Sequence, residues 1–488
     1  MSRILAIDQG TTNTKVVLFD ASLTPVARAS RPTRTHYPAD GWAEQSADEI
    51  WQSVRAAIGE VVAAEGAGGI EGIAISNQRE TLVLWDAEGG PAPCPAILWQ
   101  CRRTAGRCAE LIAEGHDETV VAATGLGINP LFPASKLAWA MENVDRVAEL
   151  HAAGRLRGGT VDTWLLWNLT GGAAFATDHS NASRTLLFDT AKLDWSEELA
   201  SLFGAPHDVL PKPMPSDSRF GVTAESATAL PAGVPILSVM GDSHAALYGH
   251  DIRAPGEVKA TFGTGSSLMT LTPERTASGN GLSGTIAWSE GGRTAYALEG
   301  NITVSAQAAA YVAGLLGLPS PAALSDLAQT VPDANGVSFV PALAGLGAPH
   351  WDDAARGTIG GLTLSAGPAH IARATFEAIA HQVADVFEAM ERDIGQPLAA
   401  LKADGGASGN DWLMQLQADL LGRPVLRRDM AEIGARGAAS MALRALGHAA
   451  KEAAGPMVRF APLMKDAERH RHRAAWVAAV AQARARSA

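Results

Sequence analysis

The pattern of hydrophobic and polar residues first predicts a β-hairpin at the start of the chain. Residues 4–7 form a continuous apolar run, as expected for a strand buried on both faces, and residues 15–19 predict a second strand. The turn between them, residues 8–14, is rich in hydroxyl groups and small side chains. The backbone N–H groups of such a glycine turn can converge on a polyphosphate. An ordinary hairpin with a polar turn is the alternative.

A partial copy of this hairpin occurs in the second half of the chain. Residues 259–262 lead into the small, hydroxyl-rich turn 263–267, and residues 268–271 predict the returning strand. Two such hairpins that face each other can bind one nucleotide from both sides. The chain contains no G-x-x-x-x-G-K-[ST] motif, and no G-x-G-x-x-G follows a strand. These absences argue against a Walker P-loop and against a Rossmann dinucleotide site.

An acidic residue marks the end of a further predicted strand. Residues 235–240 run into Gly241 and Asp242, and a helix follows. An acid at the carboxyl end of a strand lies where α/β folds place their chemistry. The alternative is that Asp242 only caps the helix. We place the domain boundary here, with residues 1–240 as the N-terminal domain and residues 241–488 as the C-terminal domain.

Other segments are less specific. The polar turn 77–81, Asn-Gln-Arg-Glu-Thr, lies between two predicted strands, and a solvated turn is favoured over a ligand-facing one. Residues 160–169 are apolar, and their periodicity does not separate strand from helix. Residues 368–393 predict a long helix with one buried stripe. The basic, Ala-rich residues 469–486 predict a helix with a solvated face.

Composition narrows the class of protein. The 488 residues are 47% hydrophobic and 18% charged, which suits two or three domains with a large core. A net charge of −12 with no evident basic face makes nucleic acid a poor partner. Because neither a signal peptide nor an 18-residue apolar span is visible, we expect a cytoplasmic protein with no membrane partner. Cys94, Cys101 and Cys108 are expected to be free thiols, since zinc sites prefer closely spaced pairs.

Several segments together resemble the FGGY carbohydrate kinases. The strongest match is Gly-Thr-Ile-Gly-Gly-Leu at residues 357–362, followed after seven residues by His370-Ile371. Residues 77–81 and 181–185 are similar to the glycerol kinase-like branch of the family. The other segments that carry the resemblance are residues 7–15, 72–76, 160–164, 180, 263–265, 345–352 and 404–410.

The resemblance implies a fold, two cofactors and a set of residue roles. The fold is α/β: a two-domain actin-like ATPase (ribonuclease H-like) fold with the active site in the interdomain cleft. The cofactors are ATP and Mg²⁺, and Asp242 is the general base that takes a proton from the attacking hydroxyl. Asp8 and Asp242 would hold the metal. The nucleotide would contact Thr11, Thr12, Asn13, Gly263, Thr264, Gly405, Gly406, Ala407 and Asn410. The substrate would contact Arg79, Glu80, Trp99, Leu131, Asp242, Ser243 and Ser267.

The departures from the family pattern lie around the substrate. Glycerol kinases usually carry an aromatic residue at the position of Leu131, Gln at the position of Ser243 and Phe at the position of Ser267. Smaller side chains imply a wider pocket lined by hydroxyl groups, in which Phe132 could partly replace the missing ring. Cys101 stands where Asp is usual, which removes a carboxylate near the site. His244, beside the base, is expected to be a helix-face histidine with no part in the chemistry.

We therefore expect an ATP-dependent kinase of a small polyol or ketose sugar larger than glycerol, with about four to six carbons. Glycerol kinase proper, forming glycerol 3-phosphate, is the first alternative. A non-catalytic actin-like nucleotide-binding protein is a remote one. A homo-oligomer, dimeric or tetrameric, is also expected.

Overall fold

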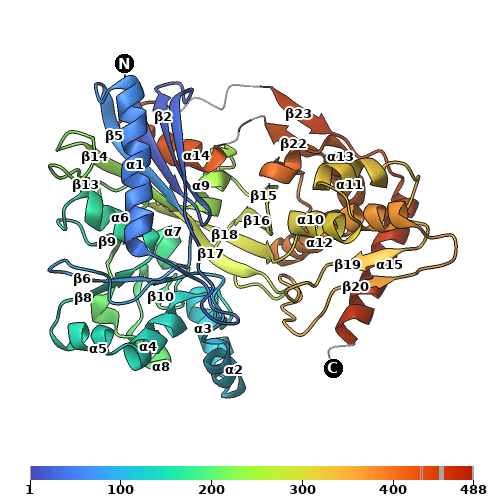
Figure 1. The fold of residues 1–488 in the computed structure, drawn as a ribbon, viewed down its shortest axis with the longest axis horizontal. Coiled ribbons are helices and arrows are strands. Elements are labelled where there is room, and N and C mark those ends of the chain that lie inside the picture. Colours follow the sequence, from blue (N-terminus) through green and yellow to red (C-terminus); the bar gives the residue numbers. More distant parts are fainter. Residues whose placement is uncertain (1, 429, 431, 450–455, 486–488) are drawn as a thin grey trace.

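Two mixed β-sheets, each covered by helices, make up the two halves of the protein in a computed structural model (Figure 1). The structure describes residues 2–428, 430, 432–449 and 456–485. The first sheet has the strand order β13-β14-β5-β1-β2-β3. Its strands are β1 (Arg3–Gln9), β2 (Asn13–Asp20), β3 (Pro25–Pro32), β5 (Ile70–Asn77), β13 (Gly221–Val222) and β14 (Pro235–Gly241).

The second sheet repeats the plan of the first. Its order is β17-β18-β16-β15-β21-β22-β23, so an antiparallel hairpin is again followed by parallel neighbours. The hairpins β1–β2 and β15–β16 confirm the two predicted from the sequence. The strands are β15 (Glu257–Phe262), β16 (Ser266–Thr272), β17 (Ser283–Glu290), β18 (Arg293–Ile302), β21 (Ala400–Asp404), β22 (Val425–Arg428) and β23 (Met457–Phe460).

The remaining elements are short strand pairs and helices. The pairs are β4 (Glu44–Gln45) with β7 (Ala96–Ile97), β6 (Val83–Asp86) with β8 (Leu156–Gly159), β9 (Ala176–Asp178) with β12 (Lys212–Met214), β10 (Phe188–Asp189) with β11 (Asp194–Trp195) and β19 (Ser338–Val340) with β20 (Thr358–Gly360). The α-helices are α1 (Ala47–Glu65), α2 (Ala105–Ala113), α3 (Asp117–Thr124), α4 (Pro133–Asn143), α5 (Asp145–Ala152), α6 (Val161–Leu169), α7 (His179–Ala182), α8 (Glu197–Phe203), α9 (Asp242–Gly249), α10 (Ala306–Leu315), α11 (Pro321–Ala328), α12 (Pro368–Ile394), α13 (Asp411–Leu421), α14 (Ile433–Ala445) and α15 (Asp466–Ala485). Two 3₁₀ turns are η1 (His207–Val209) and η2 (Gly406–Gly409).

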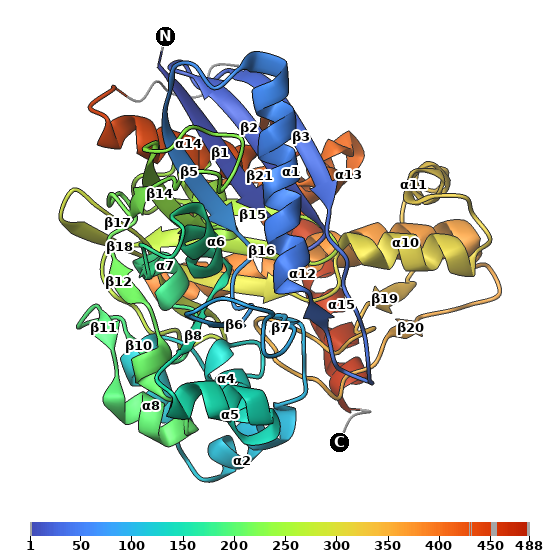
Figure 2. The ribbon, with the colours of Figure 1, turned by 60° about the vertical axis from the view of Figure 1, so that its left-hand side comes forward.

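The first strand is buried on both faces, as its apolar run predicts. Leu5 and Ile7 pack in the same cluster as residues of α1, whereas Ile4 and Ala6 pack with residues of α9 and α14. Figure 2 shows α1 lying along this sheet. The alternation of side chains along a strand explains why a continuous hydrophobic run is needed here.

A layer made of α9 and α14 lies between the two sheets. Its apolar cluster joins residues of the first sheet with Met269, Leu271 and Trp288 of the second. The helices approach closely, because a Cβ atom built on Gly437 would lie 1.9 Å from the carbonyl oxygen of Ala245. Because α9 packs against both sheets, the domain boundary at residue 240 remains a prediction.

The structure decides how two helical segments of the sequence fold and adds a buried face to a third. Residues 160–169 contain the helix α6, and the long predicted helix is α12. The C-terminal helix α15 has the solvated face predicted from the sequence, and it also has a buried face that was not predicted. Its Arg473 and Trp476 are buried and both bond to Asp385 of α12. This buried face of α15 packs in one cluster with apolar residues of the C-terminal half. Among the described residues, no helix is long and apolar enough to span a membrane.

Replacing Gly437 by Ala tests the helix layer. The added methyl group cannot fit against the Ala245 carbonyl, so Gly437→Ala should lower the free energy of unfolding by about 1–3 kcal/mol. Denaturant unfolding measures this. The matched control is Gly59→Ala in α1, where a Cβ atom meets nothing within 4 Å, and which should be neutral or stabilising. Equal stability of the two variants would contradict the close packing.

Candidate active site

The predicted catalytic and metal-binding residues gather at one edge of the first sheet. Strands β1, β5 and β14 are parallel neighbours, and Asn77 is in register with both Gln9 and Gly241. Asp8 therefore lies near the end of one strand, Arg79 just beyond the next and Asp242 just beyond the third. The carboxyl ends of parallel strands are where such folds assemble a site.

Asp8 provides a carboxylate suited to a divalent cation. Its partner across the sheet is Ser76, whose Oγ donates a hydrogen bond of 2.8 Å to Asp8 Oδ1. Burial raises the pKa of Asp8, and the nearby Asp242 carboxylate raises it further. Two neighbouring carboxylates fit Mg²⁺, a hard cation that takes oxygen ligands. The donor set is therefore compatible with the metal role predicted for both residues.

Asp242 is the first residue of α9, and its carboxylate is accessible. Its side chain is 45% exposed, and its Oδ1 accepts hydrogen bonds from Arg79 Nε at 3.0 Å and from the backbone N–H of Ser243 at 2.6 Å. Gly241, not Asp242, occupies the helix N-cap position, so the capping interpretation is wrong. A fixed, solvent-accessible carboxylate is suited to accept a proton.

The polar turn after β5 is buried, which corrects the prediction of a solvated turn. Every residue from 77 to 81 is at most 8% exposed. Arg79 Nη1 donates to Glu299 Oε2 of β18 at 2.9 Å, and Glu80 Oε1 accepts from Arg184 Nε at 2.7 Å. Burying these charges requires pairing, so the turn is part of an internal ionic cluster rather than a surface loop.

Glu299 and Arg184 complete this cluster, and the sequence analysis missed both roles. Both are completely buried, and Arg184 Nη2 lies 2.8 Å from Glu299 Oε2. Burial alone would raise the pKa of Glu299, but the guanidinium groups of Arg79 and Arg184 hold it well below its usual value. The available signal was a single acidic residue that directly follows the apolar pair Ala297-Leu298 in β18.

The predicted serines lie together beside Asp242. Ser243 Oγ and Ser267 Oγ are 2.9 Å apart. Lys259 Nζ, completely buried on β15, donates to Ser243 Oγ at 3.1 Å, and Ser267 Oγ donates to Glu299 Oε1 at 2.9 Å. The hydroxyl groups expected to line a widened pocket are therefore already hydrogen-bonded to one another and to two buried charges. Lys259 was not singled out from the sequence.

The other predicted substrate residues are positioned by the first half of the chain. Trp99 Nε1 donates to Thr11 Oγ1 at 3.0 Å, so Thr11 faces Trp99. Leu131 is partly buried against the neighbouring apolar cluster. The ring of Phe132 lies 5.2 Å from the guanidinium of Arg184, which ties this ring to the ionic cluster.

A buried lysine links the three backbone segments that carry the substrate residues. Lys136 Nζ donates to the carbonyl oxygens of Leu131 at 2.7 Å, Leu98 at 2.8 Å and Glu80 at 3.3 Å. Burial lowers the pKa of Lys136 to about 7, whereas three acceptors around the nitrogen favour the ammonium form. The sequence analysis did not single out this lysine.

The predicted nucleotide residues lie on three turns. Thr12 and Asn13 are exposed in the first turn, and Thr264 is exposed in the second. The second turn is tight, because a Cβ atom on Gly265 would lie 2.4 Å from the carbonyl oxygen of Ile302. Gly263 accepts from the backbone N–H of Ala306, the first residue of α10.

The third turn lies directly beside the second. Gly405 has a φ of +88°, and a Cβ atom there would lie 2.6 Å from the carbonyl oxygen of Phe262. Gly406 is exposed and Ala407 is half-buried. Asn410 caps α13 by accepting from the N–H of Leu413, so it has a structural role besides the predicted nucleotide contact.

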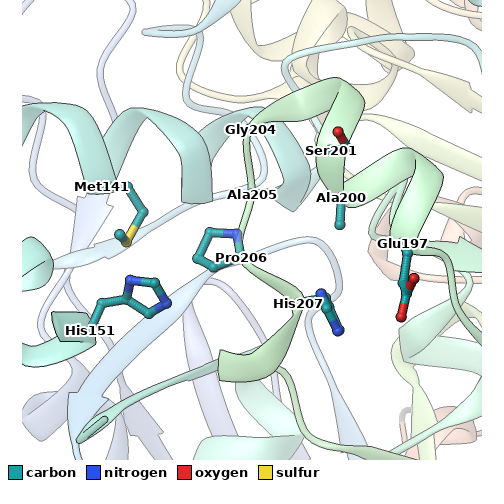
Figure 3. A pocket seen from close by; sticks show the side chains of 9 residues that line it. All are labelled: Met141, His151, Glu197, Ala200, Ser201, Gly204, Ala205, Pro206 and His207. Atoms are coloured by element: carbon teal, nitrogen blue, oxygen red, sulfur yellow. The ribbon is translucent and has the colours of Figure 1, made fainter. Parts of the chain in front are cut away.

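A surface hollow lies elsewhere, on the helical part of the N-terminal half that contains α4, α5 and α8 (Figure 3). Figure 3 shows the side chains of Met141, His151 and His207 around it. None of the residues predicted for catalysis, nucleotide or substrate lines this hollow. It is therefore separate from the candidate site.

Comparison with known proteins identifies the family. The N-terminal domain model of the FGGY family of carbohydrate kinases matches residues 3–249, and the C-terminal domain model matches residues 258–446. A glycerol kinase of Symbiobacterium thermophilum is 45% identical, with 99% of this chain and 98% of the relative covered. An apulose kinase of Pectobacterium atrosepticum is 46% identical, with 91% and 90% covered.

A solved structure supports the same assignment. The crystal structure of Plasmodium falciparum glycerol kinase with ADP has a TM-score of 0.92 and is 30% identical, with 99% of this chain and 98% of that chain covered. The expected two-domain α/β kinase fold is thereby confirmed. Since both domain models and full-length relatives agree, the chain belongs to the FGGY family of carbohydrate kinases.

Proposed function

We propose that the protein transfers the γ-phosphoryl group of ATP to a hydroxyl of a polyol or ketose larger than glycerol, with Asp242 as the general base. Family membership makes the protein an ATP-dependent carbohydrate kinase that uses Mg²⁺; the substrate and the residue roles are the proposal. The observation that carries it is the exposed Asp242 carboxylate, held by Arg79 beside two serine hydroxyls.

The proposed mechanism relies on positioning and charge. Asp242 accepts the proton as the substrate oxygen attacks, while Arg79 and the N–H of Ser243 keep the carboxylate in place. Asp8 and Asp242 would hold Mg²⁺, which when bound neutralises phosphate charge. The turns at Thr12 and Thr264 supply exposed hydroxyls and N–H groups for the phosphates.

The size of the substrate is argued from side-chain volume. Leu131, Ser243 and Ser267 are smaller than the aromatic, Gln and Phe residues usual in glycerol kinases, which favours an acceptor of about four to six carbons. Relatives named glycerol kinase and apulose kinase are about equally similar to this chain, so identity alone does not separate these substrates. Glycerol is the second candidate, favoured if the hydrogen-bonded serines leave room for three carbons only.

Cytoplasmic location and a dimeric or tetrameric state also remain proposals based on the sequence. Size-exclusion chromatography with light scattering measures the oligomeric state.

An acceptor panel tests the substrate. ADP release from Mg-ATP should show a higher kcat/KM for a tetritol, pentitol, pentulose or hexitol than for glycerol, because the wider pocket accommodates the added hydroxyls. Turnover of glycerol far above that of every longer acceptor would overturn the size argument while leaving the kinase assignment intact.

Replacing Asp242 by Asn tests the base. Asn keeps the shape and can still accept from Arg79, but it cannot take the proton. Asp242→Asn should therefore lower kcat about 100-fold or more, while thermal unfolding and ATP binding by calorimetry stay near wild type. Full activity of this variant would show that another group is the base.

Replacing Lys136 by Met tests the backbone clamp. Three buried carbonyl oxygens would lose their donor, so the KM for the acceptor should rise about 10-fold or more. The KM for ATP should change less than about twofold, since no predicted nucleotide residue contacts Lys136.

Lys402→Met is the matched control, because Lys402 of β21 also donates to a backbone carbonyl, that of His250. It should leave the KM for the acceptor unchanged. A parallel rise in both KM values of Lys136→Met would indicate general destabilisation and contradict the positioning role.

A further inference from the structure

We propose that Ser243 and Ser267 form a subsite that presents only hydrogen-bond acceptors to the substrate and therefore selects a hydroxyl group over a carbonyl or carboxylate. This inference rests on the proposed function and deepens it, since it names the chemical group that the second part of the acceptor must carry.

The direction of the hydrogen bonds follows from the number of protons. Glu299 can only accept as a carboxylate, so the single proton of Ser267 is directed to its Oε1, 2.9 Å away. Ser267 then has no proton left for Ser243. The 2.9 Å contact between the two hydroxyl groups is therefore made by the proton of Ser243.

The other end of the chain of hydrogen bonds agrees with this direction. Lys259 can only donate as an ammonium group, and it donates to Ser243 Oγ at 3.1 Å. Because Glu299 only accepts at one end and Lys259 only donates at the other, a single arrangement of the two serine protons satisfies all the hydrogen bonds. Each serine proton is used within the cluster, and each serine oxygen keeps one lone pair that no partner within the cluster occupies.

The surroundings keep this arrangement from reversing. Glu299 is completely buried and is held in the ionic form by Arg79 and Arg184. Turning the Ser267 hydroxyl away would leave a buried carboxylate oxygen facing a lone pair at 2.9 Å. Because that lone pair would face a charged oxygen that water cannot screen, the proton of Ser267 stays directed toward Glu299.

The lone pairs lie beside the proposed base. Ser243 follows Asp242 in the chain, and Arg79 binds both Asp242 and Glu299. The base, the arginine, the carboxylate and the serine pair thus form one closed ring of contacts. Ser267 is partly exposed and Ser243 is 8% exposed, whereas Glu299 and Lys259 are completely buried. A ligand therefore reaches the Ser267 oxygen before it reaches Ser243 or the charges behind the pair.

The chemical consequence is selectivity for a donor. A substrate hydroxyl can donate to a serine oxygen. A carbonyl or carboxylate at the same carbon would place its lone pairs against those of the serines. The subsite therefore fits a polyol, or the hydroxyl-bearing part of a ketose, and disfavours a sugar acid whose carboxylate reaches the serines.

The test starts from the polyol with the highest kcat/KM in the acceptor panel. Analogues of this polyol have one hydroxyl replaced by hydrogen, or one hydroxyl oxidised to a carbonyl. A further analogue has its terminal carbon oxidised to a carboxylate. Removing or oxidising the hydroxyl that is phosphorylated should abolish turnover. At a second position the deoxy analogue should lose about 10-fold in kcat/KM. The kcat/KM of the oxidised analogue at this position should fall further than that of the deoxy analogue, because its lone pairs repel those of the serines in addition to the lost hydrogen bond.

Ser267→Ala distinguishes the proton arrangement from a merely structural role. Without the Ser267 hydroxyl, the proton of Ser243 is free to be donated to a ligand. The ratio of kcat/KM between the polyol and its oxidised analogue should therefore shrink about 10-fold or more. The control is Ser266→Ala, which removes the neighbouring hydroxyl of β16 that donates to Ser305 at 2.7 Å, and which should keep the wild-type pattern.

The outcomes separate the two proposals. Equal kcat/KM for the hydroxyl and oxidised analogues in the wild type, or the same pattern in both serine variants, would overturn the subsite alone. Turnover of no polyol and no ketose would overturn the proposed function and the subsite with it. Thermal unfolding of each variant identifies any loss that comes from misfolding.

Discussion

The structure depends on one buried ionic interaction between its two halves. Glu299, on β18 of the second sheet, is paired with Arg79, which follows β5 of the first sheet, and with Arg184 beyond α7. All three are buried, so none can be satisfied by water. Removing one partner from such a pair typically costs 3–5 kcal/mol, because the remaining charge stays buried. The cluster therefore fixes the position of one sheet edge relative to the other and, through Arg79 Nε, the position of Asp242.

The same cluster connects folding with chemistry. Parallel strands bring Asp8, Arg79 and Asp242 to one sheet edge, and the two hairpin turns bring exposed hydroxyls from each half. Asp242 stays accessible while the charges behind it are enclosed. Phosphoryl transfer requires mainly positioning and charge compensation from the protein. A rigid ring of polar contacts around one accessible carboxylate supports that requirement, and our proposals on substrate size and hydroxyl selectivity both depend on it.

Much of the fold followed from local patterns. The two hairpins, the strand that ends before Asp242 and the long helix α12 each have a signal within about 20 residues: an apolar run, a glycine turn or a helical stripe. The family resemblance supplied the roles that we propose for Asp242 and for the glycine turns. These are features that short segments of sequence encode.

The ionic cluster could not be predicted in the same way. Arg79 and Glu299 are 220 residues apart, and Glu80 and Arg184 are 104 apart, so only the folded chain pairs them. Without those partners the charged turn after β5 was interpreted as solvated. Lys136 and Lys259 were missed for the same reason, since a lysine is normally exposed and its burial becomes plausible only when three carbonyls or a hydroxyl pair surround it. The burial of α15 was missed because its contacts with α12 lie about 90 residues away in sequence.

The most direct measurement is a crystal structure of the protein with Mg²⁺, a non-hydrolysable ATP analogue and the preferred polyol. Our account predicts one polyol hydroxyl within about 2.6–3.2 Å of the Asp242 carboxylate and a second hydroxyl that donates to Ser243 or Ser267. A polyol bound with its reactive hydroxyl away from Asp242, or with no hydroxyl at the serine pair, would contradict the account.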